Sequence, residues 1–488
     1  MSKILDIQTY NKKDKSPKIN FIYNITYQML ILILPLITTP YLSRVVGASG
    51  VGIYSYTYSI VYYFMLLCLL GVNNYGNRSI AKVRDNKEKL SKTFWSIYFL
   101  QLFMGILMLI VYFIYVFISN SQYKNIAIIQ SLYIISAILD INWFYFGLEE
   151  FKVTITRNSI VKIGSIVLIF ALVKSFDDLW KYVLIMSGTT VLSQLILWLL
   201  LKKKINFIKI SFKDIFIHIK PNLVLFIPVI AISLYKIMDK IMLGRMSNVT
   251  EVGFYENAEK IASIPMTIVS ALGTVMLPRM SNIVAKGEVD KIKTYISKSI
   301  SFVQFLSYAM CFGLIAIGYN FAPIFFGEEF QKTGTLIMLL ATTIPFLAFA
   351  NVIRTQYLIP NEQDKVYIVS VFLGALINFI MNIIFIPYFS SIGACFGTIA
   401  AEFMVMFYQS FAVRKTLDIK SYLKEGFAFL IKAIIMCIII YPFNFFQMNS
   451  VVRILLQVTI GVIIYVILNY KYVFSIINKK IIKINNRK

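Results

Sequence analysis

Long apolar segments, separated by short polar ones, make up most of this chain. Windows of about 20 predominantly apolar residues are long enough to cross the hydrocarbon layer of a bilayer as helices. Fourteen such helices are expected, at residues 19–42, 50–72, 94–117, 125–148, 158–176, 180–201, 221–244, 253–279, 298–323, 334–358, 366–387, 391–412, 427–444 and 451–471. Because a soluble domain would not expose so much apolar surface, the pattern predicts an all-α polytopic membrane protein.

Two neighbouring apolar segments each carry three charges at the helical spacing i, i+3, i+4. These charged residues are Lys236, Asp239, Lys240, Glu256, Glu259 and Lys260. Each triplet gathers on one helix face, and each charge facing lipid at mid-membrane would cost about 2.5–3.5 kcal/mol. The side chains must therefore face one another or water. Either ion pairs brace the hairpin, with Lys240 and Glu256 at similar depth, or the charges line a cavity, and the two arrangements can coexist.

Three further charged residues inside expected spans are candidates for the same cavity. Arg354 can grip a phosphate bidentately or snorkel to the inner surface, and Asp140 is a candidate partner for it across a cleft. Glu402, with Asn378 and Asn382, can line a cation path, although interhelical hydrogen bonding is the simpler account.

A stripe of tyrosines at i, i+4, i+8 runs along the second expected helix. Tyr54, Tyr58 and Tyr62 can stack on the faces of sugar rings. Tyrosines are also common at the membrane interface without any ligand, so both interpretations stay open.

The net charge of +25 is informative because of where the lysines and arginines lie along the chain. Lysines and arginines cluster in alternate loops, which predicts both termini in the cytoplasm by the positive-inside rule and makes a nucleic-acid partner unnecessary. The four cysteines lie in apolar spans and the single histidine, His218, has no ligand cluster beside it. We therefore expect no metal site, no catalytic nucleophile and no cofactor.

An internal repeat divides the chain. The sequence Val51-Gly-Ile-Tyr54 matches Val252-Gly-Phe-Tyr255 at an offset of 201, and Arg44 matches Arg245. Helices 1–6 thus repeat as helices 7–12, which predicts two pseudo-symmetric six-helix bundles around a cleft, followed by two extra helices. The expected parts are a basic cytoplasmic leader (1–18), a first lobe (19–201), a basic cytoplasmic linker (202–220), a second lobe (221–412), a cytoplasmic loop (413–426), the two last helices (427–471) and a basic cytoplasmic tail (472–488).

Several segments resemble the polysaccharide-transport family of repeat-unit flippases, the Wzx type. They are Tyr235-Lys-Ile-Met-Asp-Lys-Ile-Met-Leu-Gly244, Glu251-Val-Gly-Phe-Tyr-Glu-Asn-Ala-Glu-Lys-Ile261, Leu277-Pro-Arg-Met-Ser281, Pro35-Leu-Ile-Thr-Thr-Pro-Tyr-Leu-Ser-Arg44 and Gly50-Val-Gly-Ile-Tyr54. The resemblance implies a fold related to exporters of the MATE type and to lipid II flippases. It also implies a bacterial cytoplasmic-membrane protein that turns undecaprenyl-pyrophosphate-linked oligosaccharides from the inner to the outer leaflet, for capsule, O-antigen or teichoic-acid-like polymers, beside the polymerase and chain-length proteins of that pathway.

The charged residues then receive roles in a hypothesis of alternating access. The four cations Lys236, Lys240, Lys260 and Arg354 attract the pyrophosphate, and Asp239, Glu256 and Glu259 limit that grip. The membrane potential can drive the anion outward, or a proton or sodium ion can couple at Asp239, Glu259 or Glu402. The rival functions are a MATE-type drug or metabolite exporter and a membrane-embedded polymerase or glycosyltransferase. No phosphate-cradling glycine loop or catalytic cluster favours an enzyme.

Overall fold

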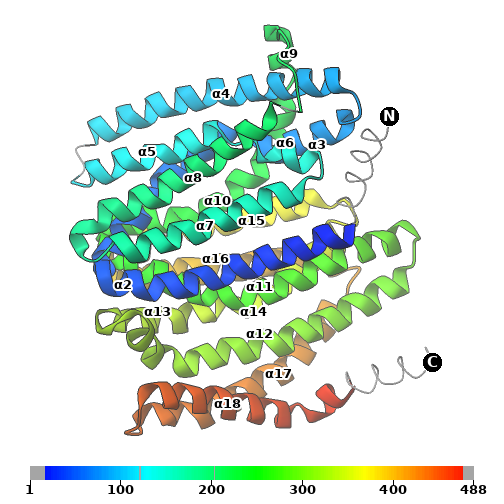
Figure 1. The fold of residues 1–488 in the computed structure, drawn as a ribbon. Helices are drawn as coiled ribbons and strands as arrows, with labels where there is room; N and C mark the ends of the chain where they lie inside the picture. Colours follow the sequence, from blue (N-terminus) through cyan, green and yellow to red (C-terminus); the bar gives the residue numbers. More distant parts are fainter. Residues whose placement is uncertain (1–16, 120–121, 203, 476–488) are drawn as a thin grey trace, which may run out of the picture. The chain divides into compact units, whose positions relative to one another are not determined.

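The structure, a computed structural model, describes the backbone of residues 17–119, 122–202 and 204–475 (Figure 1). Side chains are described from residue 33 onward within these ranges, except at position 235. Every regular element in these ranges is a helix, which confirms the all-α prediction. Most of the basic leader and of the basic tail expected from the sequence lies outside the described residues.

Thirteen helical segments of the described chain are long and apolar enough to cross a membrane. The difference from the fourteen expected ones arises at α2 (Pro17–Leu69), which is continuous over two expected spans. Gly47 interrupts it with φ 66° and ψ 179°, a backbone conformation open to glycine and strained for other residues. Two spans therefore meet at a kink in α2, where a loop was expected.

The chain forms two compact units, Met1–Ser233 and Leu234–Lys488. The first contains α2 and then α3 (Val72–Val83), α4 (Lys87–Ile118), α5 (Lys124–Ile138), α6 (Asn142–Gly147), α7 (Phe151–Leu172), η1 (Phe176–Asp178), α8 (Leu179–Leu201), α9 (Phe212–Phe216) and the first part of α10 (Ile219–Met246).

The second unit begins within α10. It continues with α11 (Val249–Ala285), α12 (Val289–Phe326), η2 (Glu328–Phe330), α13 (Gln331–Ala341), α14 (Thr343–Ile353), η3 (Arg354–Leu358), α15 (Asp364–Phe389), α16 (Ser391–Val413), α17 (Ile419–Ile440), η4 (Tyr441–Phe445) and α18 (Ser450–Leu468). All of 221–244 was expected in the second lobe, whereas α10 contributes to both units. The repeat-related lobes stay a prediction, since compact units need not share their limits.

One expected span is broken in the first unit. The helix predicted at 125–148 consists of α5 and α6, and the break between them frees backbone carbonyls. The Gln101 side chain donates from Nε2 to the carbonyl oxygens of Ala137 (2.7 Å) and Asp140 (2.9 Å). In hydrocarbon an unpaired carbonyl is costly, so Gln101, fully buried in α4, makes the break possible.

The α15–α16 hairpin is closely packed through small residues. Gly393 and Gly397 have the small-xxx-small spacing that lets membrane helices approach. A Cβ atom on Gly397 would collide with the amide group of Asn382 in α15, which is fully buried. Glycine at 397 therefore provides the space for that amide.

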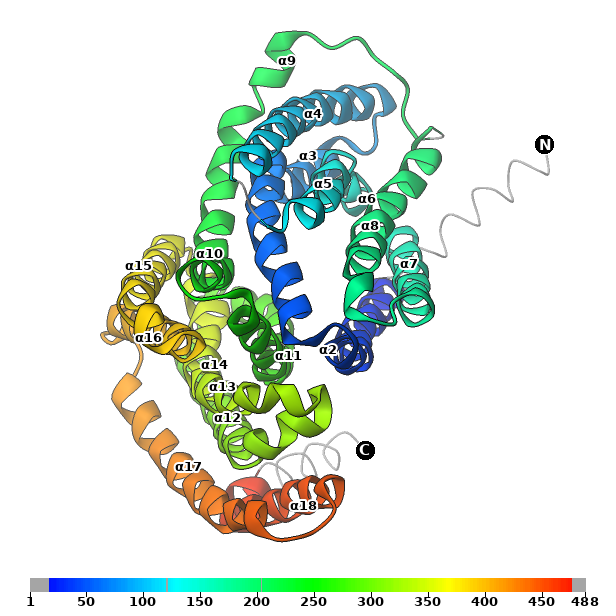
Figure 2. The same cartoon turned by 90° about the vertical axis from the view of Figure 1, so that its left-hand side faces the viewer.

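The two last helices pack against α12 within the second unit, as Figure 2 shows. The Tyr465 hydroxyl in α18 donates to the carbonyl oxygen of Phe305 in α12 over 2.9 Å. Gln457 Nε2 donates to the carbonyl oxygen of Ile440 over 3.0 Å and so joins α18 to α17. The hairpin expected at the end of the chain is thus fastened to its unit by buried polar contacts.

The glycine in the α15–α16 contact can be tested by stability. We expect Gly397→Ala to destabilise the protein by about 1–3 kcal/mol, because the added methyl group overpacks the site. Gly164→Ala is the matched control, since a Cβ there has no neighbour within 4 Å, and it should be neutral or stabilising by up to about 1 kcal/mol. Thermal unfolding of both variants in detergent measures the difference, and equal midpoints would contradict the packing argument.

Candidate functional site

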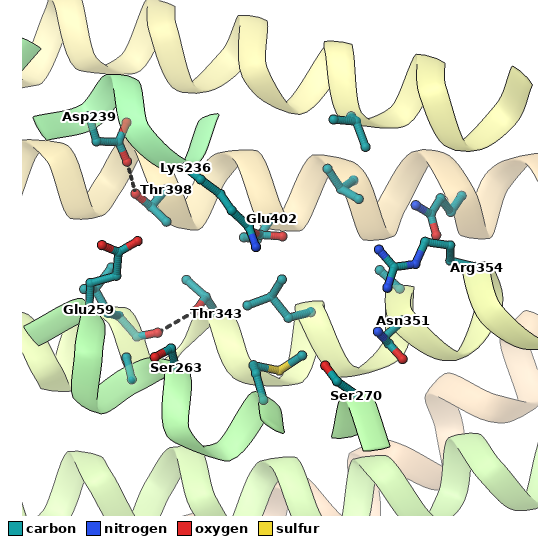
Figure 3. A pocket seen from close by; sticks show the side chains of 18 of the residues that line it. Lys236, Asp239, Glu259, Ser263, Ser270, Thr343, Asn351, Arg354, Thr398 and Glu402 are labelled. Atoms are coloured by element: carbon teal, nitrogen blue, oxygen red, sulfur yellow. Dashed lines mark hydrogen bonds between the residues drawn. The ribbon is translucent and has the colours of Figure 1, made fainter. Parts of the chain in front are cut away.

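A polar cavity of about 270 Å³ lies within the second unit, bounded by α10, α11, α13, α14, η3, α15 and α16 (Figure 3). Five charged residues line it, together with hydroxyl and amide groups. The charged residues are Lys236, Asp239, Glu259, Arg354 and Glu402. The cavity has room for a phosphate-sized group together with water molecules.

Arg354 enters the cavity from a local irregularity in its helix. η3 is a π-helical turn, and such turns often occur at functional sites. The guanidinium donates from Nη1 to the Tyr367 hydroxyl over a long 3.4 Å and lies 5.4 Å from the centre of that ring. Among the described residues of the second unit no carboxylate lies within ion-pair distance of Arg354.

Lys236 is the second cation of the cavity. Its side chain is exposed and extends toward Glu402 in Figure 3. Within the part of the chain that the structure describes, Lys236 forms no ion pair. Lys236 and Arg354 therefore keep hydrogen-bonding capacity for an anion in the cavity, because neither is neutralised by a carboxylate in direct contact.

Glu402 is the buried acid between these cations. It is 5% exposed, lies on α16 and interacts electrostatically with both Lys236 and Arg354. No hydrogen bond to its carboxylate is found among the described side chains. The carboxylate is thus held in the cavity by charge rather than by fixed donors.

Asp239 has the opposite environment. It is 2% exposed and accepts hydrogen bonds from Asn382 Nδ2 (2.7 Å), the Thr398 hydroxyl (2.8 Å) and the Tyr255 hydroxyl (3.0 Å). Asn382 also donates to Asn378 Oδ1 over 3.2 Å. The two asparagines that were expected to accompany Glu402 accompany Asp239 instead, and for Asn382 the interhelical hydrogen-bonding interpretation is confirmed.

The remaining charges of the stripe form the brace. Lys240 Nζ lies 2.6 Å from Glu256 Oε2 and 2.8 Å from Glu259 Oε2, and Lys260 Nζ lies 3.2 Å from Glu256 Oε1. The predicted pairing of Lys240 with Glu256 is confirmed. The stripe therefore both braces the hairpin and lines a cavity. Ion pairs join α10 to α11, Lys236 and Asp239 line the cavity, and Glu259 does both.

Asp140 lies in the first unit, at the break between α5 and α6. Its Oδ1 accepts from the backbone N (2.8 Å) and Nδ2 (2.6 Å) of Asn142. Arg157 donates from Nη2 to Asn142 Oδ1 (2.8 Å) and from Nη1 to the carbonyl oxygen of Ser193 (2.8 Å). The pairing of Asp140 with Arg354 stays a prediction. Arg157 was not predicted, because its signal in the sequence is no more than an arginine at the edge of an apolar window.

The predicted tyrosine stripe is present on α2. The rings of Tyr54 and Tyr58 stack with centres 5.8 Å apart, and Tyr58 lies 6.1 Å from Tyr62. Two residues from other helices join them, since the Tyr133 hydroxyl is 2.7 Å from that of Tyr54 and the Tyr182 ring is 4.8 Å from the Tyr54 ring. The stripe is therefore part of a larger aromatic cluster, and its use in sugar binding stays a prediction.

Comparison with known proteins identifies the family of this chain. A family model described as "Polysaccharide biosynthesis protein" matches residues 18–284, more than half of the chain. A putative O-antigen transporter of Escherichia coli is 23% identical over 400 residues, covering 81% of this chain and 96% of its own length. A probable low-salt glycan biosynthesis flippase of Haloferax volcanii is 23% identical over 240 residues, covering 49% of this chain and 50% of its own length. The names of the two relatives describe a transporter and a flippase.

Two solved structures have a similar fold. One, described as the lipid II flippase MurJ in an inward closed conformation, has a TM-score of 0.76 at 18% identity and covers 94% of this chain and 100% of its own. A multidrug resistance MATE family transporter in an inward-facing conformation has a TM-score of 0.57 at 13% identity, with coverage of 80% and 99%. The predicted relation to the MATE-like fold is confirmed.

The brace and the cavity cations should respond differently to the loss of a lysine. Lys240→Met should destabilise the protein by about 3 kcal/mol or more, because it removes the shared cation of two glutamates in a low-dielectric environment and leaves Glu256 with Lys260 alone. Lys236→Met should cost clearly less, because Lys236 forms no ion pair among the described residues of the second unit and Arg354 still compensates Glu402. The unfolding midpoints of both variants in detergent check this.

The same measurement on a compensated variant separates charge from packing. Adding Glu256→Gln and Glu259→Gln to Lys240→Met should restore part of the lost stability. If the unfolding midpoint of Lys240→Met is no lower than that of Lys236→Met, the stabilising role of the brace is contradicted.

Proposed function

Because the chain belongs to the polysaccharide biosynthesis protein family, we propose that it is a flippase for lipid-linked oligosaccharides. The cargo is a repeat unit on undecaprenyl pyrophosphate, which moves from the inner to the outer leaflet of the bacterial cytoplasmic membrane. The product serves a capsule, an O-antigen or a teichoic-acid-like polymer, and polymerase and chain-length proteins of that pathway act beside the flippase. Both termini lie in the cytoplasm in this proposal.

The observation that supports it is the pair of cations without carboxylate partners in a polar cavity of a membrane helix bundle. A pyrophosphate and its sugars cannot cross hydrocarbon unaided, whereas a polyprenyl tail is soluble there. Only the head group needs shelter. Lys236 and Arg354 offer it charge-assisted hydrogen bonds, which are about twice as strong as neutral ones.

The lining of the cavity refines the roles that the sequence suggested. The cavity accepts a phosphate-sized group, and the Tyr54, Tyr58 and Tyr62 stripe stays the candidate surface for the sugars. We assign contact with phosphate to Lys236 and Arg354. Lys240 and Lys260 act indirectly, by keeping α10 and α11 in register.

Two energy sources are compatible with this arrangement. An inside-negative potential favours outward movement of an anion by about 2.3 kcal/mol per charge per 100 mV. A cation coupled at a cavity carboxylate is the alternative, with Asp239, Glu259 and Glu402 as candidates.

The second candidate function is a drug or metabolite exporter, which the fold similarity to a MATE family transporter allows. The family match and the names of the sequence relatives favour the flippase. Resistance profiling of a deletion strain, beside measurement of accumulated lipid-linked sugars, distinguishes the two functions.

The assignment of the cations predicts a loss of transport without a loss of protein. Lys236→Gln and Arg354→Gln should each lower surface polysaccharide about 10-fold or more, because a hydrogen bond to a charged group contributes about 1.5–3 kcal/mol. Polymer on the cell surface and accumulation of lipid-linked repeat units are measured in a strain whose own copy is deleted. Lys420→Gln, an exposed lysine at the start of α17, is the control and should leave both unchanged. A normal amount of surface polymer in both cavity variants, at a normal protein level, would contradict the assignment of Lys236 and Arg354 to the phosphate.

The energy source predicts a second outcome in vesicles. With the potential and the pH gradient set separately, transport driven by the cargo's own charge should follow the potential and ignore the pH gradient. A dependence on the pH gradient indicates a coupled proton, and transport that is indifferent to both gradients would contradict both accounts.

A further inference from the structure

The cavity contains its own anion at the place where the cargo's phosphate should bind. Glu402 is 5% exposed and interacts electrostatically with Lys236 and Arg354, the same cations that we assign to the phosphate. Its carboxylate has no hydrogen-bond donor among the described side chains. A buried carboxylate without donors is stable as an anion only while neighbouring cations compensate it.

The other titratable groups that face the cavity are already satisfied. On α10, Asp239 accepts three hydrogen bonds, and on α11, Glu259 lies 2.8 Å from Lys240 Nζ. The Tyr255 hydroxyl donates to Asp239, and Tyr367 on α15 accepts from Arg354. Glu402 therefore differs from these acids, because its charge is balanced only by cations that a ligand would also use.

We propose that Glu402 is an internal counter-anion that competes with the cargo's phosphate for Lys236 and Arg354, and that it takes up one proton when the phosphate binds. This rests on the proposed function, which places a phosphate in the cavity. Two anions cannot share one small site at low dielectric without strong repulsion, and proton uptake by one of them is the usual resolution. The phosphate keeps its charge and the carboxyl group becomes neutral.

The competition also explains how a cationic site releases its cargo. When Glu402 loses its proton again, the carboxylate replaces the phosphate as partner of both cations. Affinity should then fall as the pH rises, by up to about 10-fold per pH unit for a single coupled proton. A site without such an acid would bind the anion more tightly and release it more slowly.

Binding to the purified full-length protein tests the proposal. The probe is farnesyl pyrophosphate, titrated calorimetrically at pH 7.5 in buffers of different ionisation enthalpy, which counts the protons taken up on binding. Glu402→Gln should take up fewer protons than the wild type, by up to one per bound probe, and should bind about 10-fold more tightly. Because protons exchanged by the probe itself are common to both proteins, the difference reports on Glu402.

Two controls make the result specific. Asp239→Asn removes the rival acid and should keep the proton uptake of the wild type, and Glu402→Met is a second neutral variant in case Glu402→Gln does not fold. Thermal unfolding without the probe shows that each variant is intact. Unchanged proton uptake in folded Glu402→Gln, or its loss in Asp239→Asn alone, would overturn the proposal.

The failure of this inference differs from that of the proposed function. If the probe binds and the double variant Lys236→Gln, Arg354→Gln weakens it, the phosphate site stands whatever the proton count shows. If the double variant binds as tightly as the wild type, the site itself is wrong and Glu402 has no anion with which to compete.

Discussion

A charge inside a membrane must be compensated, and this requirement organises the second unit. The brace meets it with short ion pairs, since Lys240 lies within 2.8 Å of two glutamates. Asp239 meets it with three neutral donors from three other helices. The charges of the cavity are compensated without direct contact, by electrostatic attraction of Lys236 and Arg354 to Glu402. The first two arrangements hold helices together, and the third leaves groups available for a ligand.

The three arrangements depend on one another through α10 and α11. The stripe on α10 places Lys240 toward the brace and Lys236 and Asp239 toward the cavity, with one helical turn between the two ends. The Asp239 cluster in turn needs the space beside Gly397, because a larger residue there would displace Asn382. Packing of small residues between α15 and α16 thus supports the polar site, although none of the glycines contacts a charge.

The sequence predicted the helices well and the contacts unevenly. Hydropathy located the spans because each is longer than the apolar layer, and helical spacing gathered the six charges of the stripe on two faces. The pairing of Lys240 with Glu256 could be predicted, because the two residues lie equally far from the turn between α10 and α11. The partners of Asp239 could not be predicted, because Asn382 and Thr398 lie about 150 residues away in sequence. The helix break at Asp140 and the π-helical turn at Arg354 were also missed, since both depend on tertiary contacts such as those of Gln101.

That π-helical turn makes the position of Arg354 depend on chain length as well as on residue type. A π turn contains one residue more than a regular turn of α-helix. Removing a single residue from η3 would convert it to a regular α-helical turn, and the helix on either side would keep its orientation, because the π turn absorbs the extra residue. The side chains within the turn, that of Arg354 among them, would point in new directions while the apolar character of the span stayed intact. The site therefore depends on one inserted residue, which a hydropathy profile does not reveal.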